Sequence, residues 1–456
     1  ISAVRARFVR KEFKFGIKVP NTVAEARLLD VANGDTFWEK SIEKEMKNVR
    51  VAFRILDNDK NLPVDYQCIP CRLLFDVKLD FTRKTRLVAG GHVTDPPAII
   101  TYASVVSRKS VRIALLIAAL NDCEVLGADI SNAYLTAPTT ERVWTVLGPE
   151  WGADAGRRAI IVRALYGLKS SGAAYRNHLA SYLRELNFKS CLADPDVWLR
   201  TACRQDGEAY YKYLLVYVDD LLAISEQPQA ILNDVNTYFH LKPESVGTPD
   251  LYLGAKLSKT KLPNGVTAWC NSSHRYVQEA IRNTEKYIQE HGGKMLRKKT
   301  QSPMDNHYRP ELDVSPLLGP DRANYYQSQL GILRWAVELG RMDIATEVSM
   351  LAAHNALPRE GHLAAVFRIY SYLKTKPNAR LIFDPTYSEI DYDSFPQENW
   401  KDFYGDVSEA IPPNAPPPLG KPVEVRCYVD ADHAGDKLTR CSRTGIIIFL
   451  NNAPII

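Results

Sequence analysis

The chain has 456 residues, of which 45% are hydrophobic and 24% charged, and its formal net charge is +5 at pH 7. This composition is ordinary for a soluble globular protein, and the length predicts two to four domains rather than one core. No apolar run reaches the roughly 18 residues of a membrane-spanning helix, so we expect no membrane association. The eight cysteines lack zinc-ligand spacing, which favours reduced thiols in an intracellular protein.

The N-terminal part of the chain is basic. Residues 1–35 are weakly patterned, and we interpret them as an arm or linker. A helix is expected at about residues 36–49, where Phe37, Ile42 and Met46 could share one face. Both ends of the chain lack start or stop signals, so we expect the sequence to be part of a longer one.

Alternating patterns follow up to about residue 260 and predict an α+β fold. The expected elements are strands of a basic sheet over residues 52–93, a buried helix over 110–120, a strand over 125–129 and a helix over 172–186. Two β-rich apolar runs, 210–218 and 221–225, are separated only by Asp219 and Asp220. This pattern is typical of a β-hairpin.

Helical patterns dominate from about residue 272 to residue 375, with one clear apolar stripe formed by Leu363, Val366, Phe367, Tyr370 and Leu373. Residues 411–422 contain six prolines and are interpreted as a stiff extended linker. A strand signal over residues 424–429 then opens a further unit that this chain does not complete.

Two adjacent carboxylates at the tip of a buried hairpin are unfavourable by themselves. Like charges repel, and burial raises the cost of keeping Asp219 and Asp220 ionised. Divalent cations with hard oxygen ligands, such as Mg²⁺, remove that cost. The alternative is a solvent-exposed turn, since Asp is common in turns.

A third carboxylate, Asp129, ends an apolar strand and could project into the same cleft. Three carboxylates would suit two metal ions, one to activate a primer 3′-hydroxyl and one to hold a nucleotide triphosphate. Read alone, Asp129 could instead be an N-cap at a strand-to-helix turn.

The order of these motifs resembles the copia-type (Pseudoviridae) reverse transcriptase family. The matching stretches are Thr85–His92, Tyr102–Ser107, Asp129–Leu135, Leu165–Lys169, Tyr217–Asp220, Tyr252–Ala255, Tyr326–Trp335 and Gly361–Val366. The resemblance covers about residues 36–456. It implies a right-hand polymerase in which fingers and a palm with a ferredoxin-like sheet occupy residues 36–260. A helical thumb and connection would occupy 261–400, a Pro-rich linker 401–423, and a partial ribonuclease H-like domain 424–456.

The resemblance implies that Asp129, Asp219 and Asp220 are catalytic and bind two Mg²⁺ ions, with Mn²⁺ as an alternative. The backbone carbonyl of Ile130 would be an added metal ligand. Tyr134 matches the aromatic steric gate that excludes a ribose 2′-hydroxyl, although the family more often has Phe there, and the alternative is a core tyrosine.

Basic residues match the family's contacts to the incoming nucleotide. Lys84 and Arg86 would meet the triphosphate, unless they form a solvated basic strand face, and Lys78 and Arg83 are weaker candidates. Lys169 would lie near the template or nucleotide. The next residues depart from the family, which commonly has Gln where this chain has Ser170.

Two further regions have candidate roles. The basic run at residues 294–299 would contact the phosphates of a template–primer duplex, or else form a solvated loop. Asp430 matches the first metal-binding carboxylate of ribonuclease H. No later acidic residues of that site follow within the chain, so ribonuclease H activity is not expected here.

The sequence therefore predicts an RNA-directed DNA polymerase that adds deoxynucleotides to a primer on an RNA or DNA template. The expected partners are the deoxynucleoside triphosphates and the rest of a polyprotein with integrase and ribonuclease H, within a cytoplasmic virus-like particle or the nucleus. The alternative is a catalytically inactive or domesticated fragment that only binds nucleic acid. A Rossmann-type enzyme is excluded, because no glycine-rich phosphate loop follows a strand.

Overall fold

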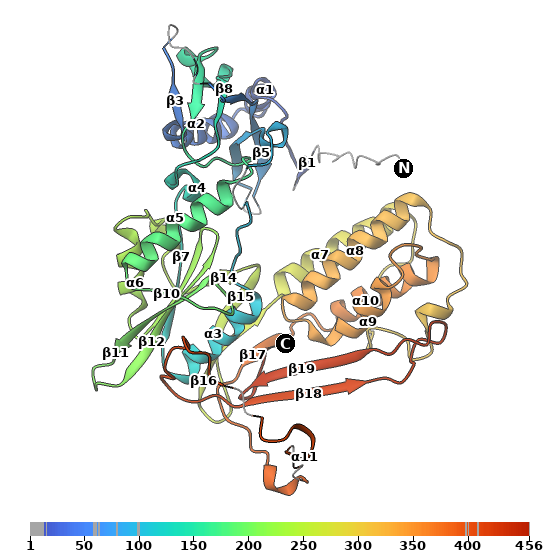
Figure 1. The fold of residues 1–456 in the computed structure, drawn as a ribbon. Helices are drawn as coiled ribbons and strands as arrows, with labels where there is room; N and C mark the ends of the chain where they lie inside the picture. Colours follow the sequence, from blue (N-terminus) through green and yellow to red (C-terminus); the bar gives the residue numbers. More distant parts are fainter. Residues whose placement is uncertain are drawn as a thin grey trace.

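The computed structural model describes residues 13–455 apart from residues 15, 58–61, 63, 79–80, 98–100, 397–398, 400 and 408–409. Helices and strands are both abundant along the chain, so the expected mixture of α and β structure is confirmed (Figure 1). Among the described residues, no helix combines the length and the hydrophobicity needed to cross a lipid bilayer.

The N-terminal unit combines two helices, a four-stranded sheet and a long hairpin around one core. Its helices are α1 (Val23–Asn33) and α2 (Phe37–Val49). Its sheet has the strand order β3 (Phe53–Ile55), β9 (Arg158–Ile161), β8 (Val143–Val146) and β4 (Gln67–Cys68). Its hairpin consists of β5 (Cys71–Val77) and β6 (Arg83–Ala89). The helix expected at residues 36–49 is confirmed, but its buried face is wrong by one residue. Trp38 is 1% exposed and packs against the Phe75 ring of the hairpin, whereas Phe37 is 54% exposed.

Of the expected arm or linker at residues 1–35, residues 1–12 lie outside the described part of the chain, and the rest contains regular secondary structure. After the short strands β1 (Phe13–Lys14) and β2 (Ile17–Lys18), helix α1 begins at a Thr22 cap, whose hydroxyl accepts a hydrogen bond from the Glu25 amide. It ends at Gly34 in the left-handed conformation. These cap signals outweigh the weak apolar periodicity, and α1 packs against α2.

The central unit is an antiparallel five-stranded sheet with helices on both faces (Figure 1). Its strand order is β10 (Lys189–Ser190), β11 (Val197–Cys203), β12 (Ala209–Tyr217), β13 (Asp220–Ser225) and β7 (Glu124–Asp129). Helices α5 (Ser171–Glu185) and α6 (Pro228–Asn236) cover one face, and α3 (Arg108–Leu120) packs on the other. Burial on both faces explains why the inner stretches of β12 and β13, residues 213–217 and 221–224, are apolar and aromatic. The expected buried helix at residues 110–120 is confirmed as α3.

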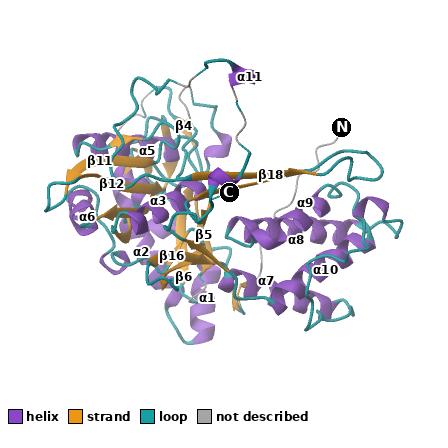
Figure 2. Cartoon of the chain, turned by 90° about the horizontal axis from the view of Figure 1, so that it is seen from below, coloured by secondary structure: helices purple, strands orange, loops and turns teal. Residues whose placement is uncertain are grey.

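The C-terminal half adds a second sheet and a helical unit, which Figure 2 shows beside the sheet layers. The sheet has the order β14 (Leu251–Tyr252), β15 (Ala255–Lys261), β16 (Thr267–Ser272) and β17 (Arg380–Phe383), and the helices are α7 (His274–Glu290), α8 (Pro320–Glu338), α9 (Ala345–Ala352) and α10 (Glu360–Thr375). The apolar stripe expected on α10 faces the core that these helices share, with Phe367 only partly buried.

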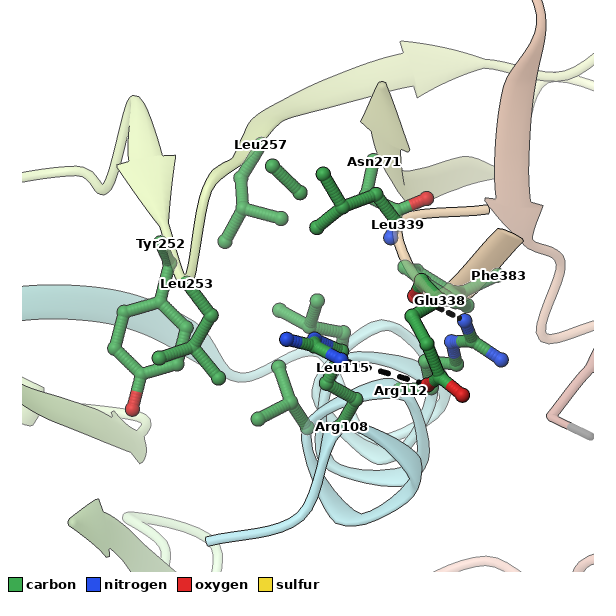
Figure 3. Close-up of a pocket in the computed structure, with 12 residues that line it drawn as sticks. Arg108, Arg112, Leu115, Tyr252, Leu253, Leu257, Asn271, Glu338, Leu339 and Phe383 are labelled. Carbon is green, nitrogen blue, oxygen red and sulfur yellow. Dashed lines mark hydrogen bonds and ion pairs between the residues drawn. The ribbon is translucent and has the colours of Figure 1, made fainter. Parts of the chain in front are cut away.

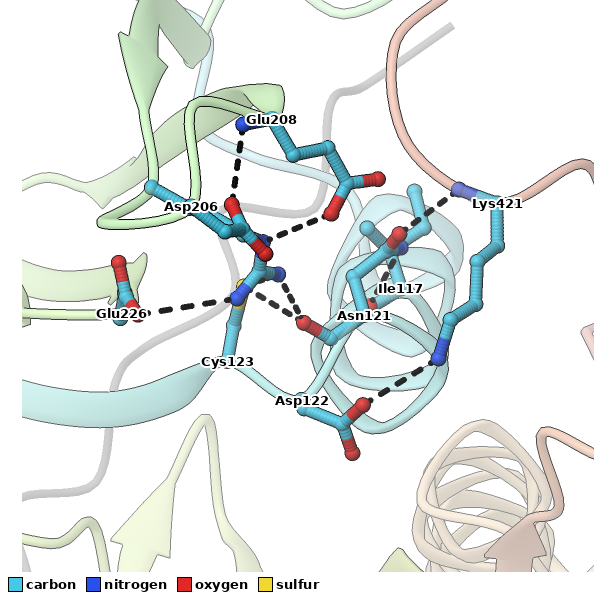
Figure 4. A network of polar contacts seen from close by, with 9 residues as sticks. Ile117, Asn121, Asp122, Cys123, Asp206, Glu208, Glu226 and Lys421 are labelled. Carbon is cyan, nitrogen blue, oxygen red and sulfur yellow. Dashed lines mark hydrogen bonds and ion pairs between the residues drawn. The ribbon is translucent and has the colours of Figure 1, made fainter.

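The Pro-rich segment lies against the central unit rather than free in solvent. The Tyr211 hydroxyl donates to the Pro417 carbonyl at 2.7 Å, and the Lys421 amide donates to the Asn121 side chain at 2.9 Å. Figure 4 shows the Lys421 ammonium also reaching Asp122, at 3.2 Å. Beyond this segment, β18 (Val425–Ala431), β19 (Thr444–Leu450) and β20 (Ala453–Pro454) form a third antiparallel sheet. The remaining short helices are α4 (Ala133–Thr136) and α11 (Lys401–Tyr404).

Two arginines of α3 join the central unit to the helical unit and to the end of the chain (Figure 3). Arg108 lies over the Trp335 ring at 3.7 Å and pairs with Glu338 at 3.4 Å. Arg112, which is buried, donates to the backbone carbonyls of Glu338 and Ile455, each at 2.8 Å.

Arg112→Met should therefore lower the thermal unfolding midpoint. The substitution keeps the apolar part of the side chain but removes the N–H groups that donate to two carbonyls. Leaving a buried acceptor without a partner lowers the free energy of unfolding by about 1–3 kcal/mol. Arg282→Met, on an exposed part of α7, is the matched control. Calorimetry that gave equal midpoints for the two variants would contradict this role of Arg112.

Candidate active site

The tip of the β12–β13 hairpin places two aspartates next to each other. Tyr217 pairs with Asp220, so the two turn residues are Val218 and Asp219, one position earlier than the Asp219-Asp220 break expected from the sequence. Val218 has φ of +58°, which is strained for a β-branched residue. Because Val218 is apolar, the sequence pattern assigned it to the preceding strand, and the turn was predicted one residue too late. Backbone strain of this kind is concentrated at functional sites.

Strand β7 brings the third aspartate to the same place. Asp129 lies directly opposite Asp220 in the antiparallel register, and opposite residues project from the same face of a sheet. The amide of Ile130 donates to the carbonyl of Asp219 at 2.8 Å, which fixes the end of β7 to the hairpin turn. Three residues that are distant in sequence are thus held together by backbone pairing.

The surroundings of Asp219 and Asp220 disfavour ionisation of their carboxyl groups. Burial, and then the charge of Asp129, raise the pKa of Asp219. Burial together with the charges of Asp219 and Asp129 raises the pKa of Asp220 to about 6. Within the described part of the chain, no three acidic, His or Cys side chains are close enough to hold a metal ion as they stand. A divalent cation would still relieve this repulsion, and carboxylate oxygens are the ligands that Mg²⁺ prefers.

Lys242 supplies a positive charge to this cluster and was not expected from the sequence. Its ammonium lies 2.5 Å from Oδ1 of Asp129, and its amide donates to the Asp129 carbonyl at 2.9 Å. The Ser245 hydroxyl donates to the carbonyl of Lys242 at 2.7 Å and accepts a hydrogen bond from the Asp129 amide at 2.8 Å. The ammonium thus supplies a positive charge directly at one carboxylate oxygen of Asp129.

An aromatic wall borders the carboxylates. Tyr134, on α4, lies 4.9 Å from the Tyr166 ring and 5.8 Å from the buried Tyr175 ring. The guanidinium of Arg86 covers Tyr166 at 4.6 Å. Burial, and then the nearby charge of Asp219, raise the pKa of Tyr134. The structure thus brings Tyr134 and Arg86 close to the aspartates, together with Tyr166 and Tyr175, which the sequence analysis had not singled out for the site.

Lys84, on β6, also lies near the cluster. Burial and the charges of Arg86, Lys78 and Lys242 lower the pKa of Lys84, and only the charge of Asp219 opposes them. Lys84 and Arg86, the cations expected to meet a triphosphate, therefore lie within electrostatic range of Asp219.

Lys169 is placed differently. Its ammonium donates to the carbonyl of Thr94, and none of the contacts among described residues connects it to the aspartates. The neighbouring Ser170 is buried, and both its amide and its hydroxyl donate to Glu141, at 2.7 and 2.6 Å. Ser170 therefore has a local structural role where the family commonly has Gln.

The other candidates lie outside this cluster. Asp430 is exposed on β18, opposite Gly445. In the run at residues 294–299, Leu296 is buried in the helical core and the basic side chains are exposed.

The carboxyl pKa values predict a pH dependence of stability. Because the folded-state pKa of Asp220 is raised above its ordinary value of 3.8 to about 6, its contribution to stability is complete below about pH 4. That contribution is lost as the pH rises through about 6. Without divalent cations, the free energy of unfolding of the wild type should fall relative to Asp220→Asn over this interval. Urea unfolding of both proteins in EDTA measures the difference, and a constant difference from pH 4 to pH 7 would contradict the pKa.

Carboxylates at a strand end and at a neighbouring hairpin tip, bordered by aromatic rings and by cations, thus form one polar site at the edge of the five-stranded sheet. Residues 53–285 match the family described as reverse transcriptase (RNA-dependent DNA polymerase), which is about half of the chain. The chain belongs to this reverse transcriptase family, and the expected copia-type resemblance is confirmed.

Curated relatives agree with this assignment. The chain is 24% identical to the retrovirus-related Pol polyprotein from transposon RE1 of Arabidopsis thaliana, over 99% of this chain. It is 24% identical to the RE2 polyprotein of the same plant over 97% of the chain, and 22% identical to that of transposon TNT 1-94 of Nicotiana tabacum over 91%. The chain spans 28% of the length of each of these relatives.

Proposed function

We propose that this chain is an RNA-directed DNA polymerase that adds deoxynucleotides to a primer 3′ end. The observation that carries the proposal is the register that places Asp129 opposite Asp220 with Asp219 in the adjoining turn. The raised pKa values of Asp219 and Asp220 support it, because carboxylates crowded in this way are suited to divalent cations.

The units of the fold have matching roles in this proposal. The N-terminal unit with the β5–β6 hairpin corresponds to the fingers, the five-stranded sheet with its helices to the palm, and α7–α10 to the thumb. The sheet of β18–β20 corresponds to the start of a ribonuclease H-like domain, with Asp430 as its first carboxylate. The exposed basic residues at 294–299 would contact duplex phosphates.

Asp129, Asp219 and the Ile130 carbonyl would hold Mg²⁺, with Asp220 as a further ligand. Two Mg²⁺ ions would lower the pKa of the primer 3′-hydroxyl and neutralise charge on the triphosphate. Lys84 and Arg86 orient the triphosphate by charge-assisted hydrogen bonds. The Tyr134 ring excludes a ribose 2′-hydroxyl from the sugar position, which selects deoxynucleotides.

Primer extension on an RNA template by the purified chain tests this proposal. Mg²⁺-dependent incorporation of the templated deoxynucleotide is the expected result. Binding of template–primer without incorporation would contradict it and would favour the alternative, a catalytically inactive nucleic-acid-binding fragment. A DNA template in a parallel reaction shows whether the polymerase accepts both kinds of strand.

A further inference from the structure

A basic pocket lies beside the aspartate cluster, between α2 and the β5–β6 hairpin. Its volume is about 690 Å³, a size typical of small-ligand sites. Helix α2 contributes the side chains of Lys40 and Lys44 to one wall. The hairpin and the central unit contribute four further cations to the lining, namely Lys78, Arg83, Lys84 and Lys242.

The described residues that line this pocket leave most of its positive charge without a counter-charge. In the described part of the chain, Lys40, Lys44, Lys78 and Lys84 form no ion pair. Among the described lining residues, Glu45 is the one acidic side chain, and its carboxylate accepts a hydrogen bond from the Leu87 amide at 2.8 Å. Burial raises the pKa of Glu45, so it is a weak counter-charge. A cleft lined by charges of one sign concentrates the opposite ion.

The pocket adjoins the reacting centre through Lys242. The ammonium of Lys242 contacts Asp129, and Lys84 on the hairpin wall lies within electrostatic range of Asp219. A ligand leaving the aspartates on this side would meet Lys84 and Lys242 first. It would then meet the lysines of α2.

We propose that this pocket binds polyphosphate, and that its ligand is the pyrophosphate released by nucleotide addition. This inference rests on the proposed polymerase function. In that reaction the primer 3′-oxygen forms a bond to the α-phosphorus, and the bond from the α-phosphorus to the α–β bridging oxygen breaks. Pyrophosphate leaves with that electron pair. Its two phosphates carry about three to four negative charges, which matches a compact group of cations.

A single-stranded template is the competing occupant. The exposed rings of Phe37 and Phe81 also line the pocket, and aromatic rings can stack on bases. However, the cations come from α2, the hairpin and the central unit and line one volume, whereas a strand distributes its charges about 3.4 Å apart along its length. The arrangement therefore favours a small, multiply charged anion.

Calorimetric titration with inorganic pyrophosphate in EDTA tests the pocket without requiring activity. We expect the double variant Lys40→Gln/Lys44→Gln to bind pyrophosphate at least about tenfold more weakly than the wild type, because two charge-assisted contacts are removed. Lys47→Gln is the matched control, since Lys47 is an exposed lysine of α2 that does not line the pocket. Thermal unfolding confirms that all three proteins are folded.

The same proteins are then compared in primer extension. The pyrophosphate concentration that halves the rate should rise about tenfold in the double variant and remain unchanged in Lys47→Gln. Equal pyrophosphate binding by the wild type and the double variant would overturn the proposal. A loss of template affinity that grows with the length of the 5′ overhang, with pyrophosphate binding intact, would also overturn it and assign the pocket to the template. A wild type that binds pyrophosphate through Lys40 and Lys44 but extends no primer would support the pocket while contradicting the polymerase function.

Discussion

Asp219→Asn is expected to reduce primer extension by about 10³-fold or more, because the loss of a metal-binding carboxylate removes several kcal/mol of transition-state stabilisation. Asn has nearly the same volume as Asp, and its neutral side chain relieves the repulsion that raises the pKa of Asp219. The variant should therefore be at least as stable as the wild type in the absence of divalent cations. This combination, activity lost and stability retained, separates a catalytic role from a structural one.

Single-turnover extension of a labelled primer measures the rate of Asp219→Asn, and thermal unfolding in EDTA measures its stability. The control is Asp206→Asn, at the tip of the exposed β11–β12 hairpin, where Asn keeps the oxygen that accepts a hydrogen bond from the Glu208 amide at 3.0 Å. Activity of Asp219→Asn above about a tenth of the wild-type rate would be incompatible with a role in metal binding.

Tyr134→Val is expected to weaken the discrimination against ribonucleotides by about 100-fold, which corresponds to about 2.7 kcal/mol. The Tyr134 ring is held by contacts with Tyr166 and Tyr175, so it forms a fixed wall rather than a mobile side chain. Removal of the ring leaves space for a 2′-hydroxyl, whereas the aspartates and the basic residues of β6 are unchanged. The rate with deoxynucleotides should change little. Most of the change in the ratio should come from a higher rate with ribonucleotides.

The measurement is the ratio of kcat/KM for a deoxynucleotide to kcat/KM for the matching ribonucleotide. Tyr134→Phe keeps the ring and should keep this ratio close to the wild-type value. If Tyr134→Val and Tyr134→Phe gave the same ratio, Tyr134 would be a core residue, which is the alternative left open by the sequence.

Periodicity in the sequence was sufficient to predict the elements that carry the site. The apolar runs around Asp219 and Asp220, and the strand that ends at Asp129, are buried on both faces, so their patterns are strong. The expected helices over residues 110–120 and 172–186 likewise appear as α3 and α5, because their apolar faces pack on the sheet. The three aspartates could be grouped from the order of their motifs, which resembles the reverse transcriptase family, and the strand pairing that holds them together is seen only in the structure.

Other features depend on tertiary contacts that leave no local signal. Val218 lies in the turn with a positive φ, a conformation that an apolar β-branched residue rarely adopts. The sequence pattern therefore predicted the turn one residue too late. Lys242 is one of many lysines, and only its contact with Asp129 distinguishes it. Helix α1 was missed because its start and end are defined by caps rather than by a strong apolar stripe.

The central claim is that Asp129 and Asp219 share a metal ion during nucleotide addition. A structure of the chain with template–primer, an incoming deoxynucleotide and Mg²⁺ tests it most directly. The expected result is a carboxylate oxygen of each of these two residues at about 2.0–2.1 Å from one ion, with the Lys242 ammonium displaced from Asp129. A bound nucleotide with Lys242 still paired to Asp129, and with the two carboxylates too far apart to share an ion, would contradict the claim.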